Sequence, residues 1–195
     1  MRANNFFWTV DIFNAVGMKP SGRIVDVGGS EMVILDNKDS PNPILQLECD
    51  LTFVDAGFLR APQTTKYVRA DFCDPLATSQ FQEPFDFVFS FMTLEHVYNP
   101  QIFVDNLAKI AKEDGFIIID TVFSFPYHPS PNDYWRFTPS ALSLLMGNAG
   151  VESIWSGWGS VPEDVITIGS LSNVEWIKRT RANSLEELKK ELSCV

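Results

Sequence analysis

The chain has 195 residues, a length typical of one domain with a sizeable hydrophobic core. Hydrophobic residues make up 45% of it and charged residues 21%, which is ordinary for a globular protein and unlike a disordered one. The formal net charge of −10 argues against a nucleic-acid backbone as partner, because phosphate binding needs clustered Lys and Arg side chains.

The first expected element is a helix, and strands follow it. Residues 4–16 place Phe6, Val10 and Phe13 on one face of an amphipathic helix, with Phe7 beside them. Short runs of β-branched and aromatic residues are then typical of buried strands. Five such strands are expected, at residues 23–27, 51–57, 66–72, 85–91 and 115–123.

The later elements carry recognisable caps. Asn99 is a suitable N-cap for a helix that Gly115 would end, and Thr138 opens another helix. A capping box from Ser184 to Glu187 begins a C-terminal helix. Its leucine stripe is too short for a coiled coil, which favours a helix docked on its own domain. Two further strands are expected at residues 151–158 and 164–170.

Strands that alternate with helices predict one α/β domain over residues 1–195 with a mostly parallel sheet, and a helical tail from about residue 180. In such sheets ligands bind outside the carboxyl ends of the strands. Taken alone, a glycine pair there is often a tight turn, and an Asp is often a turn former. The candidates after the strands are Gly28–Ser30, Asp55, Asp71–Phe72, residues 90–96 and residues 121–135.

One long segment resembles a known family. FDFVFSFMTLEHVYNPQIFVDNLAKIAKEDGFIIID (residues 85–120) is similar to the middle of class I S-adenosylmethionine-dependent methyltransferases, with Phe85–Asp86 opening a strand and Leu94–His96 following it. HPSPNDYWRFTP, from His128, resembles a segment of the type 11 branch of that family. The resemblance implies a Rossmann-like, seven-stranded, mostly parallel sheet with helices on both faces and an antiparallel last strand.

The resemblance also implies a site for S-adenosylmethionine. Asp55 would bind both ribose hydroxyls, since an ionised carboxylate offers two acceptor oxygens. Asp71 and Phe72 would lie at the adenine. We expect the Asp26 carboxylate to accept N–H bonds from the glycine turn. The cofactor-binding set is Asp26, Gly28, Gly29, Asp55, Asp71, Phe72 and Phe91.

The sequence departs from the family in its first loop. Glycines normally alternate there, whereas this chain has only Gly28 and Gly29. Pro41 and Pro43 interrupt the segment that should be a helix, so we expect a shortened helix or a loop. A binding or regulatory protein without catalysis therefore stays open as an alternative. A nicotinamide-dependent oxidoreductase is disfavoured, because no G-x-G-x-x-G runs into a helix.

The expected reaction is methyl transfer to a small-molecule acceptor at an oxygen, which requires alignment and often a base but no metal. His96, His128 and Arg136 are the catalytic candidates, and no metal ligand is assigned. Arg136 could hold an anionic or polar group of the acceptor, or could pair with Asp133. A homodimer stays open.

The remaining features favour the cytoplasm. Residues 1–17 lack the continuous apolar core of a secretory signal, because Asp11 and Asn14 interrupt it. No run reaches the ~20 apolar residues of a membrane span, so no membrane partner is expected. Cys49, Cys73 and Cys194 are odd in number and widely spaced, which predicts free thiols in a reducing compartment.

Overall fold

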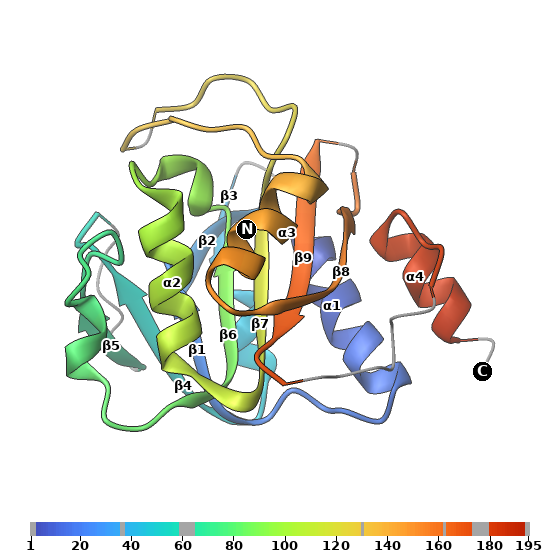
Figure 1. Ribbon diagram of the computed structural model, residues 1–195, viewed down its shortest axis with the longest axis horizontal. Coiled ribbons are helices and arrows are strands. Elements are labelled where there is room, and N and C mark those ends of the chain that lie inside the picture. Colours follow the sequence, from blue (N-terminus) through green and yellow to red (C-terminus); the bar gives the residue numbers. More distant parts are fainter. Residues whose placement is uncertain are drawn as a thin grey trace.

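A computed structural model describes residues 3–35, 38–58, 65–129, 131–161, 163–172 and 180–193 (Figure 1). Cys194 lies outside these residues. None of the helices in the described part of the chain combines the length and apolar character needed to span a bilayer. The helices are α1 (Ala3–Ala15), α2 (Pro100–Ile110), α3 (Pro139–Asn148) and α4 (Leu185–Leu192), with short 3-10 turns η1 (Pro43–Gln46), η2 (Ala77–Gln80) and η3 (Leu94–His96).

The main sheet has seven strands in the order β5-β4-β1-β6-β7-β9-β8. The pairs from β5 to β7 are parallel, whereas β9 is antiparallel to both of its neighbours. This arrangement confirms the expected Rossmann-like sheet with an antiparallel last strand. The strands are β1 (Gly22–Val27), β4 (Cys49–Asp55), β5 (Lys66–Arg69), β6 (Phe85–Phe91), β7 (Ala111–Val122), β8 (Glu152–Trp158) and β9 (Asp164–Ser170).

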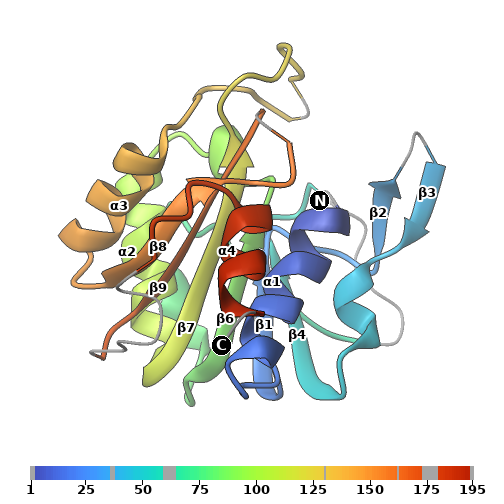
Figure 2. The same ribbon diagram turned by 90° about the vertical axis from the view of Figure 1, so that its right-hand side faces the viewer.

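Helices cover both faces of this sheet. One hydrophobic cluster joins the sheet to α2 and α3, and a second joins it to α1 and α4. Figure 2 shows α1 and α4 side by side. Leu185 and Leu188 are fully buried in the second cluster, and Lys189 pairs with Asp11 of α1. The leucine stripe of the C-terminal helix therefore docks on the rest of the chain, as expected.

The segment after the first strand differs from a Rossmann-type helix. It forms a separate hairpin, β2 (Met32–Leu35) and β3 (Lys38–Pro41), and then η1 (Figure 2). Asn42 caps η1 by accepting a hydrogen bond from the N–H of Ile44 at 3.0 Å. The sequence predicted a shortened helix or a loop here. The described residues of this segment instead form a hairpin and a 3-10 turn, and Pro41 and Pro43 disfavour a continuous helix.

The end of α2 was predicted too late. The helix ends at Ile110 and not at Gly115, and the chain enters β7 at Ala111. Ala111 pairs with Phe85 of β6, so sheet pairing takes over residues that local signals assign to the helix. Asn99 and Thr138 do cap α2 and α3 through their side chains, as predicted.

Candidate active site

A cavity of about 1130 Å³ lies at the carboxyl ends of the parallel strands. It is lined by residues at and after the ends of β1, β4, β5 and β6 and by the loop after β7. His96 and His128 also line it, whereas Arg136 is not among its lining residues. All of the sequence-predicted cofactor residues meet in this one cavity: Asp26, Gly28, Gly29, Asp55, Asp71, Phe72 and Phe91.

The two glycines after β1 are each required by close packing. Gly28 has a φ of +86°, and a Cβ there would lie 2.1 Å from Oγ1 of Thr93. A Cβ on Gly29 would lie 1.9 Å from Oδ2 of Asp26. The N–H of Gly28 donates a 2.7 Å hydrogen bond to the carbonyl of Val54 in β4. The shortened glycine motif thus builds a tight, fixed turn between β1, β4 and the segment after β6.

Asp26, at the end of β1, is buried beneath this turn. The side-chain amide of Asn42 donates to Oδ2 at 3.1 Å, while Oδ1 is buried and accepts no hydrogen bond from the described part of the chain. The expectation that the turn's N–H groups bind this carboxylate was wrong, because among the described residues its partner is Asn42. Burial raises the pKa of Asp26 to about 7, against the opposing effect of the Asn42 bond.

The other predicted cofactor residues differ in exposure. Asp55 is buried at the end of β4, where its Oδ1 accepts the Gly57 N–H at 2.7 Å. Asp71 is exposed and accepts the N–H of Cys73 at 2.8 Å. Phe72 and Phe91 are buried and contribute ring surface to the cavity. Together with Glu95, described next, four carboxylate side chains line the cavity, which favours a ligand that carries positive charge or several donors.

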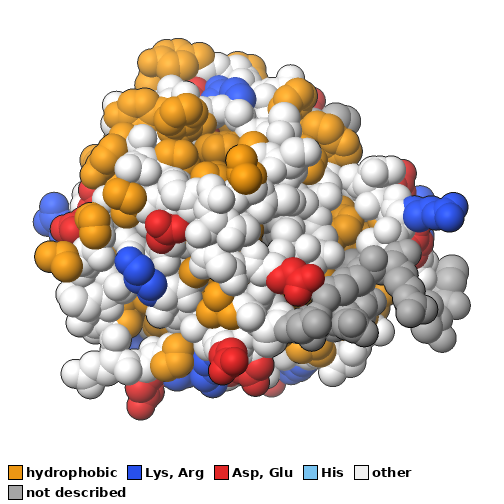
Figure 3. All heavy atoms as spheres, in the orientation of Figure 1, with side chains coloured by type: hydrophobic (Ala, Val, Ile, Leu, Met, Phe, Trp, Pro, Cys, Tyr) orange, Lys and Arg blue, Asp and Glu red, His pale blue; other side chains and the backbone are white. Residues whose placement is uncertain are grey.

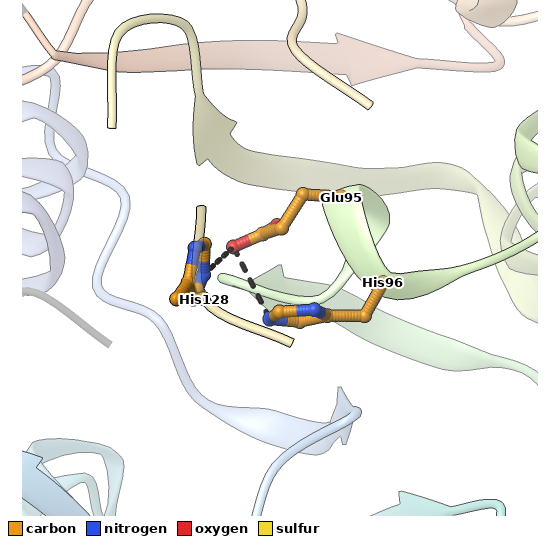
Figure 4. Close-up of side chains that lie close together, drawn as sticks. All are labelled: Glu95, His96 and His128. Carbon is orange, nitrogen blue, oxygen red and sulfur yellow. Dashed lines mark ion pairs between the residues drawn. The ribbon is translucent and has the colours of Figure 1, made fainter. Parts of the chain in front are cut away.

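Glu95, in η3, is a site residue that the sequence reasoning did not assign, although Leu94–His96 had been singled out. Its side chain is fully buried, and Oε2 accepts a hydrogen bond from Oγ1 of Thr121 at 2.8 Å. Oε1 has no hydrogen-bond partner among the residues that the structure describes, and it lies 3.7 Å from Nε2 of His96 and 3.8 Å from Nε2 of His128 (Figure 4). A glutamate next to a histidine directly after a strand was the available signal.

Arg136 binds its own loop. Its guanidinium contacts both carboxylate oxygens of Asp133, at 2.5 and 2.8 Å, and donates to the carbonyls of Phe125 and Pro126. The pairing with Asp133 that the sequence left open is the arrangement found. The guanidinium also lowers the pKa of the Asp133 carboxyl below its ordinary range. In this arrangement Arg136 fixes the shape of the loop and does not face the cavity.

The loop between β7 and α3 is further attached to the segment after β6. Backbone N–H groups of Tyr134 and Trp135 donate to the carbonyl of Glu95 at 2.8 and 3.3 Å. The indole N–H of Trp135 donates to the carbonyl of Val97 at 2.8 Å. On the outer surface hydrophobic side chains gather over this loop (Figure 3). The exposed aromatic residues of the loop are Phe123, Phe125, Tyr127, Tyr134 and Trp135.

A buried polar cluster connects the site to α1. The side-chain amide of Asn5 donates to Asp120 at 2.9 Å and to Asp164 at 3.2 Å, and its own oxygen accepts the Ser160 N–H. Burial, together with the nearby Asp164 carboxylate, raises the pKa of Asp120 well above its ordinary value. Sequence reasoning missed this cluster because its members come from distant segments.

Comparisons with known proteins agree with this geometry. A family model described as "Methyltransferase domain" matches residues 10–188. No curated protein matches the chain. The 1,6-didemethyltoxoflavin-N1-methyltransferase of Burkholderia thailandensis, solved with 1,6-didemethyltoxoflavin and S-adenosylhomocysteine, has a TM-score of 0.64 at 13% identity, covering 88% of this chain and 80% of that one.

Two further solved structures show the same likeness. Magnesium protoporphyrin IX methyltransferase of Synechocystis, with bound S-adenosylhomocysteine, has a TM-score of 0.56 at 13% identity, covering 86% of this chain and 83% of that one. An S-adenosylmethionine-dependent methyltransferase of Clostridium acetobutylicum has a TM-score of 0.55 at 7% identity, with 78% and 85% covered. At these identities the likeness establishes the shared fold.

Proposed function

The chain belongs to the methyltransferase-domain family, and on this premise we propose that it transfers a methyl group from S-adenosylmethionine to an oxygen of a small-molecule acceptor. One observation carries the proposal. The cofactor residues that the sequence predicts from separate strand ends line a single cavity, and His96 and His128 line the same cavity.

The cavity suits the cofactor. Oδ1 of Asp26 is a buried acceptor without a partner among the described residues, which supports our assignment of this oxygen to the cationic amino group of the cofactor's amino-acid end. Asp55 supplies a buried carboxylate for neighbouring hydroxyl donors, and Phe72 supplies apolar ring surface for a base. When bound, the cofactor supplies a methyl group on a positively charged sulfur. The acidic border of the cavity favours that charge.

The acceptor belongs at the side of the cavity formed by Glu95, His96 and His128. A hydroxyl acceptor must lose its proton during the transfer, so this side needs an electron-pair donor or a positive charge near the oxygen. The Nε2 atoms of both histidines face Glu95 here. Arg136 acts as a positioning residue in this proposal, because it holds the loop that carries His128.

Two neighbouring structures support the class of cofactor and acceptor. Both the Burkholderia and the Synechocystis enzymes contain S-adenosylhomocysteine, and the former also contains its small-molecule substrate. The preference for oxygen in this chain rests on the histidine pair and on the family resemblance. The rival function is a family member that binds the cofactor without catalysis.

The test begins with binding. Calorimetry of the purified protein with S-adenosylhomocysteine should show saturable binding to one site per chain. Formation of S-adenosylhomocysteine from S-adenosylmethionine is then measured against a panel of small hydroxyl compounds. A Kd of about 1 mM corresponds to a binding free energy of only ~4 kcal/mol. Absence of binding at this ligand concentration would overturn the proposal. Binding without turnover on any hydroxyl compound would favour the rival.

A further inference from the structure

Three side chains from two segments converge at the acceptor side of the cavity. Glu95 and His96 lie in η3 after β6, and His128 comes from the loop after β7 (Figure 4). A carboxylate oxygen of Glu95 and one ring nitrogen of each histidine all lie within 4.8 Å of one another. All three residues line the cavity, so an ion or group bound between them would also be in reach of a ligand in the cavity.

The hydrogen bonds of the two rings decide which nitrogen faces Glu95. Nδ1 of His96 bonds to the carbonyl of Asn132, and Nδ1 of His128 lies 3.0 Å from the carbonyl of Pro126. A carbonyl oxygen can only accept, so in each ring Nδ1 carries the proton. Each neutral ring therefore presents the lone pair of Nε2 toward Oε1 of Glu95.

These outer contacts are the ones that metal-binding histidines make. Such histidines donate their second ring N–H to a backbone carbonyl or a carboxylate, which fixes the tautomer and the ring orientation. His128 has both kinds of partner, because Nδ1 also lies 3.2 Å from Oδ2 of Asp133. Asp133 in turn is held by Arg136. The ion pair that shapes the loop thus also orients His128.

The carboxylate at the centre of this cluster is only half satisfied. Oε1 of Glu95 is buried and makes no hydrogen bond to a described residue, although Thr121 satisfies Oε2. In their neutral form the two partly exposed histidines turn lone pairs toward the carboxylate oxygen and repel it, and a buried oxygen without a partner is itself destabilising. A cation bound between them removes both penalties.

We propose that Glu95, His96 and His128 bind a divalent first-row transition-metal cation through Oε1, Nε2 and Nε2. Two imidazoles and one carboxylate form a ligand set typical of zinc and of non-haem iron, whereas magnesium and calcium prefer oxygen ligands. Ligand atoms around tetrahedral zinc lie about 3.4 Å apart. The separations of 3.7 and 3.8 Å from Oε1 need only a small contraction on binding, and the two histidine nitrogens, which lie within 4.8 Å of each other, move closer as well.

The cation also defines the acceptor class, a step that rests on the proposed function. Three protein ligands leave coordination positions open, and here they open to the cavity. A hydroxyl bound at such a position loses its proton more readily, because the cation stabilises the oxygen anion. In the transfer the acceptor O–H bond and the C–S bond break and the O–C bond forms. Sulfur keeps the C–S electron pair, and the proton passes to solvent.

The test uses protein freed of metal by chelator dialysis and titrated with Zn²⁺, and separately with Co²⁺, whose visible spectrum reports imidazole coordination. We expect one cation per chain. Glu95→Gln, His96→Gln and His128→Gln should each weaken binding at least ~10-fold. Glu113→Gln, at an exposed glutamate of β7, is the matched control and should bind as the wild type does. Thermal melts of each variant confirm folding.

The outcomes separate the metal site from the proposed function. Cation binding is measured without cofactor, and Asp55→Asn should leave it unchanged, so the site can stand even if no cofactor binds. If Glu95→Gln does not fold, the loop variant His128→Gln decides. Absence of saturable binding at about 100 μM free Zn²⁺ would overturn the metal site. Binding that none of the ligand variants weakens would overturn it equally.

Discussion

The side-chain amide of Asn42 donates a 3.1 Å hydrogen bond to the buried carboxylate of Asp26. The same amide group donates to the carbonyl of Ser30 at 2.9 Å, and the Asn42 oxygen caps η1 by accepting the N–H of Ile44. One side chain therefore joins the end of β1 to the segment after the β2–β3 hairpin. The Asn42 side chain therefore supports the turn after β1, which in a Rossmann-type fold is followed by a helix.

Asn42→Ala should consequently destabilise the protein strongly. The substitution removes a helix-type cap and leaves buried polar groups unpaired, so we expect a loss of about 2–4 kcal/mol in the free energy of unfolding. Urea denaturation measures it. Asn148→Ala, at an exposed asparagine that bonds only to Gln101, is the control and should change stability by less than ~1 kcal/mol. Equal losses in both variants would contradict the role of Asn42.

Asp26 should make stability depend on pH in the absence of cofactor. Its pKa is raised to about 7 in the folded protein, so the folded state holds the proton more tightly than the unfolded state does. This contribution is full below about pH 4 and is lost as the pH rises toward 7. The loss reaches roughly 4 kcal/mol at most.

The comparison with Asp26→Asn isolates this effect, because the amide does not titrate. The free energy of unfolding of the wild type minus that of the variant should fall between pH 4 and pH 7 and then level off. Urea denaturation at a series of pH values provides the measurement. A difference that is constant over this range would show that burial does not raise the pKa of Asp26.

Asp55→Asn should weaken S-adenosylmethionine binding more than ~10-fold, because charge-assisted hydrogen bonds contribute about 1.5–3 kcal/mol. Asparagine keeps an oxygen for the Gly57 N–H, so the turn is retained while one acceptor becomes a donor. Calorimetry with the variant and with the exposed-site control Glu113→Gln compares the affinities. If Asp55→Asn left the affinity for S-adenosylmethionine unchanged, Asp55 would not be the residue that binds the cofactor's ribose.

Arg136→Ala should loosen the loop after β7 without removing the cofactor site. The guanidinium binds Asp133 and three loop carbonyls, so its loss frees residues 123–129 and 131–137. We expect faster amide hydrogen exchange there and cofactor affinity within ~3-fold of the wild type. Arg136→Lys should not restore protection, because an ammonium cannot reproduce the planar fork.

Arg23→Ala is the control for the loop, because Arg23 lies near the amino end of β1, at the edge of the sheet opposite the loop. This variant should leave amide hydrogen exchange in the loop unaltered. Protection of that loop in Arg136→Ala equal to the wild type would mean that the aromatic and backbone contacts hold it alone.

Leu188→Ala should show that α4 is part of the fold. Leu188 is fully buried against α1 and the sheet, and truncation of a buried leucine is destabilising by about 2–5 kcal/mol. Leu144→Ala, at a leucine of α3 that is 65% exposed, is the matched control and should change stability by less than ~0.5 kcal/mol. Thermal or urea unfolding of both variants compares them. A small effect at Leu188 would indicate a loosely docked tail.

The sequence by itself determined the order and type of most elements. Runs such as residues 85–91 become buried strands because their side chains suit a sheet covered on both faces. Asn99, Thr138 and Ser184 cap helices because capping depends only on the neighbouring residues. Local signals of this kind act over a few residues, so they can be seen without the fold.

Only the tertiary structure decided the pairings between distant segments. Ala111 enters β7 because Phe85 pairs with it, and Asn42 holds Asp26 because the hairpin returns the chain to the end of β1. Likewise Glu95 meets His128 only where the ends of β6 and β7 and the loop beyond come together. A carboxylate's partners depend on spatial neighbours, and sequence spacing does not encode them.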